Sequence, residues 1–366
     1  MRAVVSLLAC GLVLTLSGCA ASPATGPAGG GGPVPKPKVG VILPDTASSA
    51  RWTTQDLPQL SQSLRFAGIE PDVENAQGDE QSFADIADNM IRNKVRALLI
   101  TPLSGDGGIA VERKAKLAGI PVIDYDRLSL GGSADYYVSF DSVNVGTMQG
   151  DGLVRCLAGR PTADIIELEG APTDNNATLF AQGQQSVLGP RYNGGGYRLV
   201  ASQRIDRWDP QVAARVFEQN LVGNGGHVDG VLAANDGLAG AVIDVLRRHG
   251  LAGRVAVTGQ DATLDGLRAV LRGEQCMTVY KPVVDEAEAA ARLAAALAKG
   301  DRSGADDLIT GNTKDVTGQR DVKSVLLGVQ AVARDSVQQL VSDNVVKAAD
   351  LCAGDVAPFC AQAGIA

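Results

Sequence analysis

Short β-branched runs alternate with amphipathic segments from residue 38 onward, which indicates buried strands separated by helices. In the first part of the chain these runs lie at residues 39–43, 71–75, 97–101, 121–125 and 137–140. Between the second and third runs, Phe83, Ile86, Ala87, Met90 and Ile91 recur at the spacing of one helix face. Continuous apolar strands that alternate with helices predict an α/β protein with a buried, doubly wound parallel sheet.

The same pattern is repeated in the second part of the chain, which predicts a second domain of the same kind. Its apolar runs lie at residues 164–168, 197–202, 228–233, 255–258 and 277–280. A helix is expected at 285–299, ended by Gly300, and a strand-like run at 324–330 leads into the segment 331–341. We expect these late elements to return to the first domain and then to cross over again. A chain of 366 residues is long enough for two domains with separate cores.

The first residues of the chain have the pattern of an export signal. Arg2 precedes an apolar run at 3–16 that ends in Leu-Ser-Gly-Cys, with the cysteine at Cys19. This ending resembles a bacterial lipobox and predicts a signal peptide at 1–18, with Cys19 acylated as the new first residue. A plain signal peptide, with Cys19 an ordinary thiol, is the alternative. Residues 19–37 are rich in Ala, Gly and Pro and predict a flexible tether.

Composition and charge exclude several classes of function. The formal net charge is −8, which argues against a nucleic-acid partner or an anionic membrane surface. His227 and His249 are the only histidines, so neither a His-rich metal centre nor a Ser-His-Asp triad is favoured. The segment 105–110 fits a loose dinucleotide fingerprint, but it follows the third strand instead of the first, and we interpret it as a glycine-rich turn. We expect no metal and no cofactor.

Four cysteines remain after the predicted signal and anchor, in a compartment that permits disulfides. Cys352 and Cys360 bracket a short loop near the end of the chain, and we expect them to pair with each other. Cys156 and Cys276 fit either a second disulfide or two buried thiols.

Polar residues gather directly after the predicted strands. In open parallel sheets this carboxyl edge is where ligands bind. The residues found there are Asp45, Asp126, Arg127, Asp141, Trp208, Asn235, Asp236, Asp261 and Lys281. A single aspartate at such a place is equally explained as a helix cap. We interpret Asp141 and Asp236, which open helices, as caps, and the other residues as a candidate site.

Eight short segments, in order along the chain, resemble the periplasmic sugar-binding proteins of ABC importers, in particular those for D-xylose and related aldoses. The segments are 49–52 (Ser-Ala-Arg-Trp), 124–127 (Asp-Tyr-Asp-Arg), 137–141 (Tyr-Val-Ser-Phe-Asp), 174–180 (Asp-Asn-Asn-Ala-Thr-Leu-Phe), 208–210 (Trp-Asp-Pro), 234–236 (Ala-Asn-Asp), 259–261 (Gly-Gln-Asp) and 277–282 (Met-Thr-Val-Tyr-Lys-Pro). The resemblance implies a type I periplasmic-binding-protein fold, with two Rossmann-like domains joined by three crossings. We expect an N-terminal lobe at 38–139 plus about 283–323, a C-terminal lobe at 140–282 plus about 324–366, and a hinge near Phe140, Pro282 and Ser324.

The resemblance also implies how a sugar is bound. Trp52 and Trp208 would be aromatic plates on the two faces of the ring, because indoles cover its apolar C–H surfaces. The polar equator of the sugar would be met by Arg51, Asp126, Arg127, Asp174, Asn176, Asn235, Asp261 and Lys281. Apart from the resemblance, either tryptophan fits a core position equally well. The first loop, 45–49, has no lysine where some relatives carry one, so the preferred aldose stays open.

The expected protein is therefore a monomeric lipoprotein on the outer face of the cytoplasmic membrane, which binds a monosaccharide and delivers it to an ABC permease. An exported glycosidase is one alternative, because Asp126, Asp174 and Asp261 could supply a pair of carboxylates. Each of these acids has a basic or amide neighbour, however, which favours binding without reaction. A sugar sensor for a signalling receptor is another alternative. A repressor of this fold would need a DNA-binding helix-turn-helix where this chain has its export signal.

Overall fold

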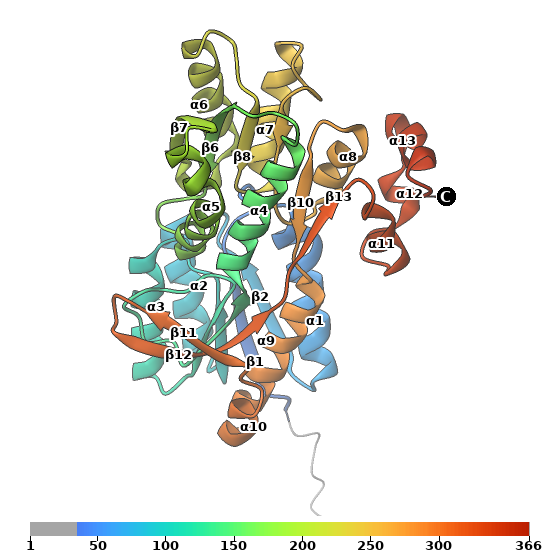
Figure 1. Ribbon diagram of the computed structural model, residues 1–366. Coiled ribbons are helices and arrows are strands. Elements are labelled where there is room, and N and C mark those ends of the chain that lie inside the picture. Colours follow the sequence, from blue (N-terminus) through green and yellow to red (C-terminus); the bar gives the residue numbers. More distant parts are fainter. Residues whose placement is uncertain (1–34, 366) are drawn as a thin grey trace, which may run out of the picture. The chain divides into compact units, whose positions relative to one another are not determined.

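The computed structural model describes residues 35–365 (Figure 1). The predicted signal peptide, Cys19 and most of the predicted tether lie outside these residues. No helix in the described range is both long enough and apolar enough to cross a membrane.

A seven-stranded sheet organises the first lobe, by which we mean this sheet and the helices packed on it. Its order is β11-β12-β5-β4-β3-β1-β2, with neighbours parallel except for the β11–β12 hairpin. The strands are β1 (Lys38–Leu43), β2 (Glu70–Asn75), β3 (Ala97–Ile100), β4 (Val122–Tyr125), β5 (Tyr136–Phe140), β11 (Gly311–Asp315) and β12 (Arg320–Leu327).

Helices cover both faces of this sheet, as the apolar runs predict. One core cluster joins strand residues to the helices α1 (Leu57–Phe66) and α9 (Val283–Ala298), and another joins them to α2 (Glu80–Arg92) and α3 (Gly105–Leu117). A short π-helix, η1 (Trp52–Asp56), precedes α1, and α10 (Arg302–Asp306) follows α9.

The second lobe contains a four-stranded parallel sheet in the order β7-β6-β8-β9 and a separate pair, β10 and β13. The strands are β6 (Ala163–Glu169), β7 (Tyr197–Arg204), β8 (Gly230–Ala233), β9 (Ala256–Val257), β10 (Met277–Tyr280) and β13 (Gln330–Ala333). The helices are α4 (Ser142–Cys156), α5 (Asn175–Asn193), η2 (Asp206–Trp208), α6 (Pro210–Gly223), α7 (Asp236–Arg248), α8 (Leu264–Arg272), α11 (Val337–Ser342), α12 (Ala348–Leu351), η3 (Gly354–Val356) and α13 (Ala357–Gln362). The run at 277–280, expected as a further parallel strand, is antiparallel to β13 instead.

The chain passes between the lobes after β5, after β10 and after β12. The first two crossings lie next to Phe140 and Pro282, where the hinge is expected. The third lies a few residues after Ser324, because β12 continues beside β5 as far as Leu327. The run 324–330 thus contains the end of β12 and the first residue of β13, which belong to different sheets. Gly328 and Val329 separate the two strands, and hydrophobicity alone could not show this boundary.

Two disulfides connect elements of the second lobe. Cys352 and Cys360 are bonded, with their Cα atoms 5.8 Å apart. The bond links the end of α12 to α13, and these helices pack on α8. Cys156 and Cys276 are also bonded, so of the two alternatives for this pair the structure contains the disulfide. The bond joins the end of α4 to the residue before β10.

Candidate ligand-binding site

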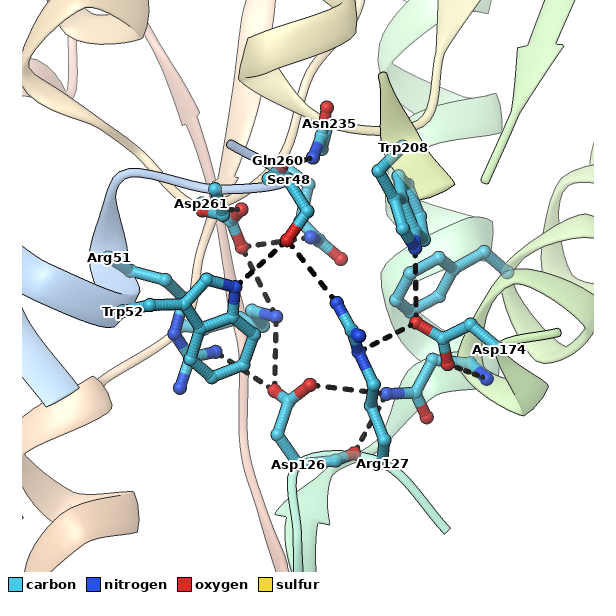
Figure 2. Close-up of a pocket in the computed structure, with 14 residues that line it drawn as sticks. Ser48, Arg51, Trp52, Asp126, Arg127, Asp174, Trp208, Asn235, Gln260 and Asp261 are labelled. Carbon is cyan, nitrogen blue, oxygen red and sulfur yellow. Dashed lines mark hydrogen bonds and ion pairs between the residues drawn. The ribbon is translucent and has the colours of Figure 1, made fainter. Parts of the chain in front are cut away.

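A narrow cavity, with about 30 Å³ of space open to water-sized molecules, lies between loops of the two lobes, at the carboxyl ends of their strands (Figure 2). The lining residues are Ser48, Ser49, Arg51, Trp52, Asp126, Arg127, Asp174, Asn176, Phe180, Trp208, Asn235, Gln260, Asp261 and Lys281. Every ligand-binding residue expected from the sequence is among them, so the fold brings the whole predicted set together.

Arg51 forms ion pairs with three carboxylates of the first lobe. It directly precedes η1 and is only 1% exposed. Its Nε and Nη2 donate to the two oxygens of Asp56 at 2.8 and 2.6 Å, Nη2 also donates to Glu286 Oε2 at 2.5 Å, and Nη1 donates to Asp126 Oδ2 at 2.9 Å. Burial opposes the charge, but these carboxylates outweigh it and raise the pKa of Arg51 further. Arg51 is therefore a fixed cation at the edge of the cavity.

Asp126 lies between the cations of the site. Lys281 Nζ is 3.6 Å from its Oδ2 and 3.1 Å from Asp261 Oδ1, so this lysine joins acids of both lobes. Burial would raise the pKa of Asp126, but Lys281, Arg51 and Arg127 together lower it. We conclude that Asp126 is ionised and acts as an acceptor.

Asp174 connects Arg127 to the second lobe. Its Oδ1 accepts from the backbone N–H of Asn176 and thereby caps α5. Its Oδ2 accepts from Trp208 Nε1 at 3.1 Å and lies 3.1 Å from Arg127 Nε. Burial raises the pKa of Asp174, against the attraction of Arg127. The ring of Phe180 meets Trp208 edge-on, with 6.4 Å between centroids.

In Figure 2 the two tryptophans lie on opposite sides of the side chains of Ser48 and Arg127. Trp52 is 2% and Trp208 is 5% exposed, and each belongs to the apolar core cluster of its own lobe. The guanidinium carbons of Arg51 and Arg127 lie 4.7 and 5.5 Å from the centroid of the Trp52 ring, at cation–π distance. Each indole thus belongs to a core and also lines the cavity.

Direct hydrogen bonds cross from one lobe to the other around the cavity. Ser49 Oγ donates to Asp261 Oδ2 at 2.9 Å, and Asn235 Nδ2 donates to the carbonyl oxygen of Ser48 at 3.0 Å. Asn176 Nδ2 donates to the carbonyl oxygen of Asp126 at 2.8 Å. The cavity is therefore enclosed by lobes that touch.

Four lining residues were missed by the residue-level interpretation of the sequence. Three of them, Ser49, Phe180 and Gln260, lie inside segments that carry the family resemblance, and the fourth, Ser48, directly precedes the first of these segments. Proximity to those motifs was the available signal. Asp45, which we kept as a site candidate, does not line the cavity; it accepts hydrogen bonds from Ala47 and Ser48 and shapes the first loop.

One of the two predicted caps is wrong. Asp141 does cap α4, by accepting from the backbone N–H of Asn144. The cap of α7 is Asn235, which accepts from Leu238, while Asp236 is the first helical residue. Asp236 instead accepts from Thr263, Gln275 and Thr278, and so ties α7 to the neighbouring segments. Adjacent Asn and Asp are both good caps, and the sequence could not separate them.

Comparison with known proteins identifies the family. The family model of the periplasmic binding protein domain matches residues 39–302. The chain belongs to the periplasmic binding proteins. It is 36% identical to the D-xylose-binding periplasmic protein of Escherichia coli, over 76% of this chain and 83% of that protein, and 34% identical to the protein of the same name from Haemophilus influenzae, over 83% and 88%.

Solved structures of periplasmic binding proteins agree with this assignment. A carbohydrate transporter solute-binding protein from Chloroflexus aurantiacus, in complex with D-glucose, has a TM-score of 0.79 and 29% identity, and the alignment covers 87% of this chain and 98% of that one. An ABC transporter solute-binding protein from Clostridium phytofermentans, with bound β-D-glucose, has a TM-score of 0.77 and 28% identity, over 86% and 99%. The chain has the type I fold of its family, and that family consists of solute-binding proteins and not of enzymes.

Proposed function

We propose that this protein binds a monosaccharide, D-xylose or a related aldose, between its two lobes and delivers it to the permease of an ABC importer. The observation that carries the proposal is the composition of the cavity: two indoles from different lobes flank a set of alternating carboxylate, cationic and amide groups. The names of the relatives and the sugars in the similar solved structures support the same ligand class.

The chemistry of an aldose matches this lining. Each sugar hydroxyl donates one hydrogen bond and accepts others, so it is satisfied best between a carboxylate and a cation. Pairs such as Asp126 with Arg51, Asp174 with Arg127 and Asp261 with Lys281 offer both partners side by side. Opposite charges in contact also reduce the cost of burying each group when the lobes close.

Binding without chemical change is the outcome that these contacts favour. A glycosidase needs one carboxyl group as an acid and a second one free to act as base or nucleophile. Here Asp126 and Asp261 share Lys281, and Asp174 is bonded to Trp208 and Arg127. Acids committed to several partners suit the recognition of hydroxyl groups.

Isothermal titration calorimetry of the purified protein with D-xylose, D-glucose, D-galactose, L-arabinose and D-ribose tests the proposal. We expect at least one aldose to bind, and Trp52→Ala and Trp208→Ala each to weaken its binding by about 2–4 kcal/mol, as for truncation of a buried aromatic contact. Phe66→Ala, at an aromatic position that is 82% exposed on α1, is the matched control and should leave affinity unchanged. Absence of binding to every aldose, or wild-type affinity in both Trp variants, would contradict the proposal.

We further propose that the sugar favours the closed arrangement of the lobes, because only there do both sets of groups reach it. Small-angle scattering should show a radius of gyration that falls at saturating sugar.

We also propose that acylated Cys19 anchors the protein on the outer face of the membrane. Labelling of whole cells with a palmitate analogue should mark the wild-type protein and not Cys19→Ala.

A further inference from the structure

Arg51 is held by side chains from outside the cavity as well as by those within it. Asp56 receives two of its N–H groups and also accepts from the hydroxyl of Tyr125 at 2.7 Å. Glu286 receives a third, although it lies far away in the sequence, on the first turn of α9. Most of the donors of Arg51 are therefore used to fix the guanidinium, and the ligand meets a group whose position is already set.

The residues that contact Arg51 include members of two crossings. Glu286 follows the second crossing, which runs from β10 through Lys281 and Pro282 into α9. Phe140 ends β5 at the first crossing; its ring centroid lies 5.9 Å from the Arg51 guanidinium carbon and 5.3 Å from Lys281 Nζ. The phenyl ring thus lies at cation–π distance from two of the cations beside Asp126, Arg51 and Lys281.

Glu286 has no place in the cavity lining and is fully buried. Its Oε2 bonds to Arg51, while its Oε1 has no hydrogen-bond partner among the described residues. Burial raises its pKa well above the usual range, against the attraction of Arg51. A buried carboxyl group with an unpaired oxygen lowers the stability of the fold. The only ion pair that Glu286 forms in the described structure is with Arg51, so the contact that it contributes is to this guanidinium.

We propose that Glu286 and Phe140 are positioning residues for ligand binding: from the first-lobe ends of two crossings they hold the guanidinium of Arg51 where the ligand needs it. The proposal rests on the function proposed above and adds to it residues that do not touch the ligand. Its consequence is that the geometry of the site depends on the geometry of the crossings.

Replacement of Glu286 tests the proposal with sugar affinity and Trp52 fluorescence as separate readouts. Glu286→Ala should weaken binding of the best aldose at least tenfold, whereas Glu286→Gln, which keeps an oxygen acceptor of the same reach, should bind within about threefold of wild type. Glu288→Ala, two residues further along α9 and exposed, is the matched control and should bind as wild type does. Phe140→Leu should weaken binding to a smaller extent, because it removes only the ring contact.

Fluorescence reports on Arg51 without any ligand. The protein has two tryptophans, so a Trp208→Phe background leaves Trp52, whose ring is stacked by Arg51, as the only indole. In this background the emission maximum should shift in Glu286→Ala and stay unchanged in Glu286→Gln and Glu288→Ala. A merely structural role would lower the melting temperature without this difference between Ala and Gln.

The proposal is overturned if Glu286→Ala keeps wild-type affinity, if Gln loses as much affinity as Ala, or if Trp52 emission does not respond to Glu286→Ala. Failure of the proposed function looks different. In that case wild-type protein binds no aldose, while the ligand-free emission of the variants still tests whether Glu286 positions Arg51.

Discussion

The backbone of Gly170 lies close to the edge of the Trp208 ring, and replacement of Gly170 by alanine is a sensitive test of the site. Gly170 directly follows β6 and does not line the cavity. A Cβ atom at this position would lie 2.1 Å from both Cζ2 and Cη2 of Trp208 and 2.7 Å from Cβ of Ala177. The backbone of Gly170 is outside the left-handed region, so the added methyl group acts through contact alone.

The expected effect follows from these distances. Carbon atoms in contact are ordinarily about 3.5–4.0 Å apart, so the edge of the indole must move by about 1.5 Å. Trp208 also donates to Asp174, which contacts Arg127, and this movement would disturb both bonds. We expect the affinity for the best aldose to fall by about 10- to 100-fold, which is about 1.4–2.8 kcal/mol. Overpacking should in addition lower stability by about 1–3 kcal/mol.

Gly150→Ala separates the effect on binding from the effect on stability. Gly150 lies on α4, where an added Cβ would be 2.9 Å from Cβ of Val187 on α5, so this variant also overpacks the second lobe without contact to the cavity. Calorimetric titration and thermal unfolding of the two variants should show reduced stability in both and reduced affinity in Gly170→Ala only. Wild-type affinity in Gly170→Ala would refute the reasoning, because it would mean that the position of the Trp208 ring does not matter for the ligand.

The disulfides and a buried acid give two further predictions. Loss of the Cys156–Cys276 bond, which spans 120 residues, should lower the free energy of unfolding by about 5 kcal/mol if the bond acts through chain entropy. Loss of Cys352–Cys360, which spans 8 residues, should lower it by about 2.5 kcal/mol. Urea unfolding of the two double Cys→Ser variants measures this difference, and equal losses would contradict the prediction. Burial, and next the charge of a neighbouring glutamate, raises the pKa of Glu169 to about 8. Between about pH 4.5 and 8 the folded state therefore keeps a proton on Glu169 that the unfolded state has released. Relative to Glu169→Gln, the free energy of unfolding of the wild type should fall by about 1.4 kcal/mol per pH unit between pH 5 and 8. Parallel pH profiles of stability for the two proteins would contradict this prediction.

The central strands β1, β3, β4, β5, β6 and β8 could be found from the sequence because they are buried on both faces and appear as apolar runs. The strands β2 and β7 were also expected to be buried, but as edge strands they are largely half-buried or exposed. The β11–β12 hairpin was missed because Gly311–Asp315 is polar and, as an edge strand, has only one strand neighbour. The same limitation applies to the site. In α9, Glu286 and Glu288 look alike in the sequence, yet the first is fully buried against Arg51 and the second is exposed. Only the packing of the first lobe distinguishes them.

Backbone conformation is the part of the site that hydrophobic periodicity cannot reveal. Asp126, Trp208 and Asp261 all have positive φ values, of 63°, 56° and 96°, and all of them line the cavity. Glycine would adopt these turns with less strain, but it has no side chain to offer a ligand. Each turn follows the end of a strand and directs a carboxylate or an indole into the cavity, where ion pairs and hydrogen bonds hold it. Positive φ alone does not mark the site, because six other residues within 35–365 that are not glycine also have it and do not line the cavity: Gln77, Lys94, Arg207, Ala262, Gln319 and Asn344. The three cavity positions differ from these in that the turn places a carboxylate or an indole among the ion pairs and hydrogen bonds of the site.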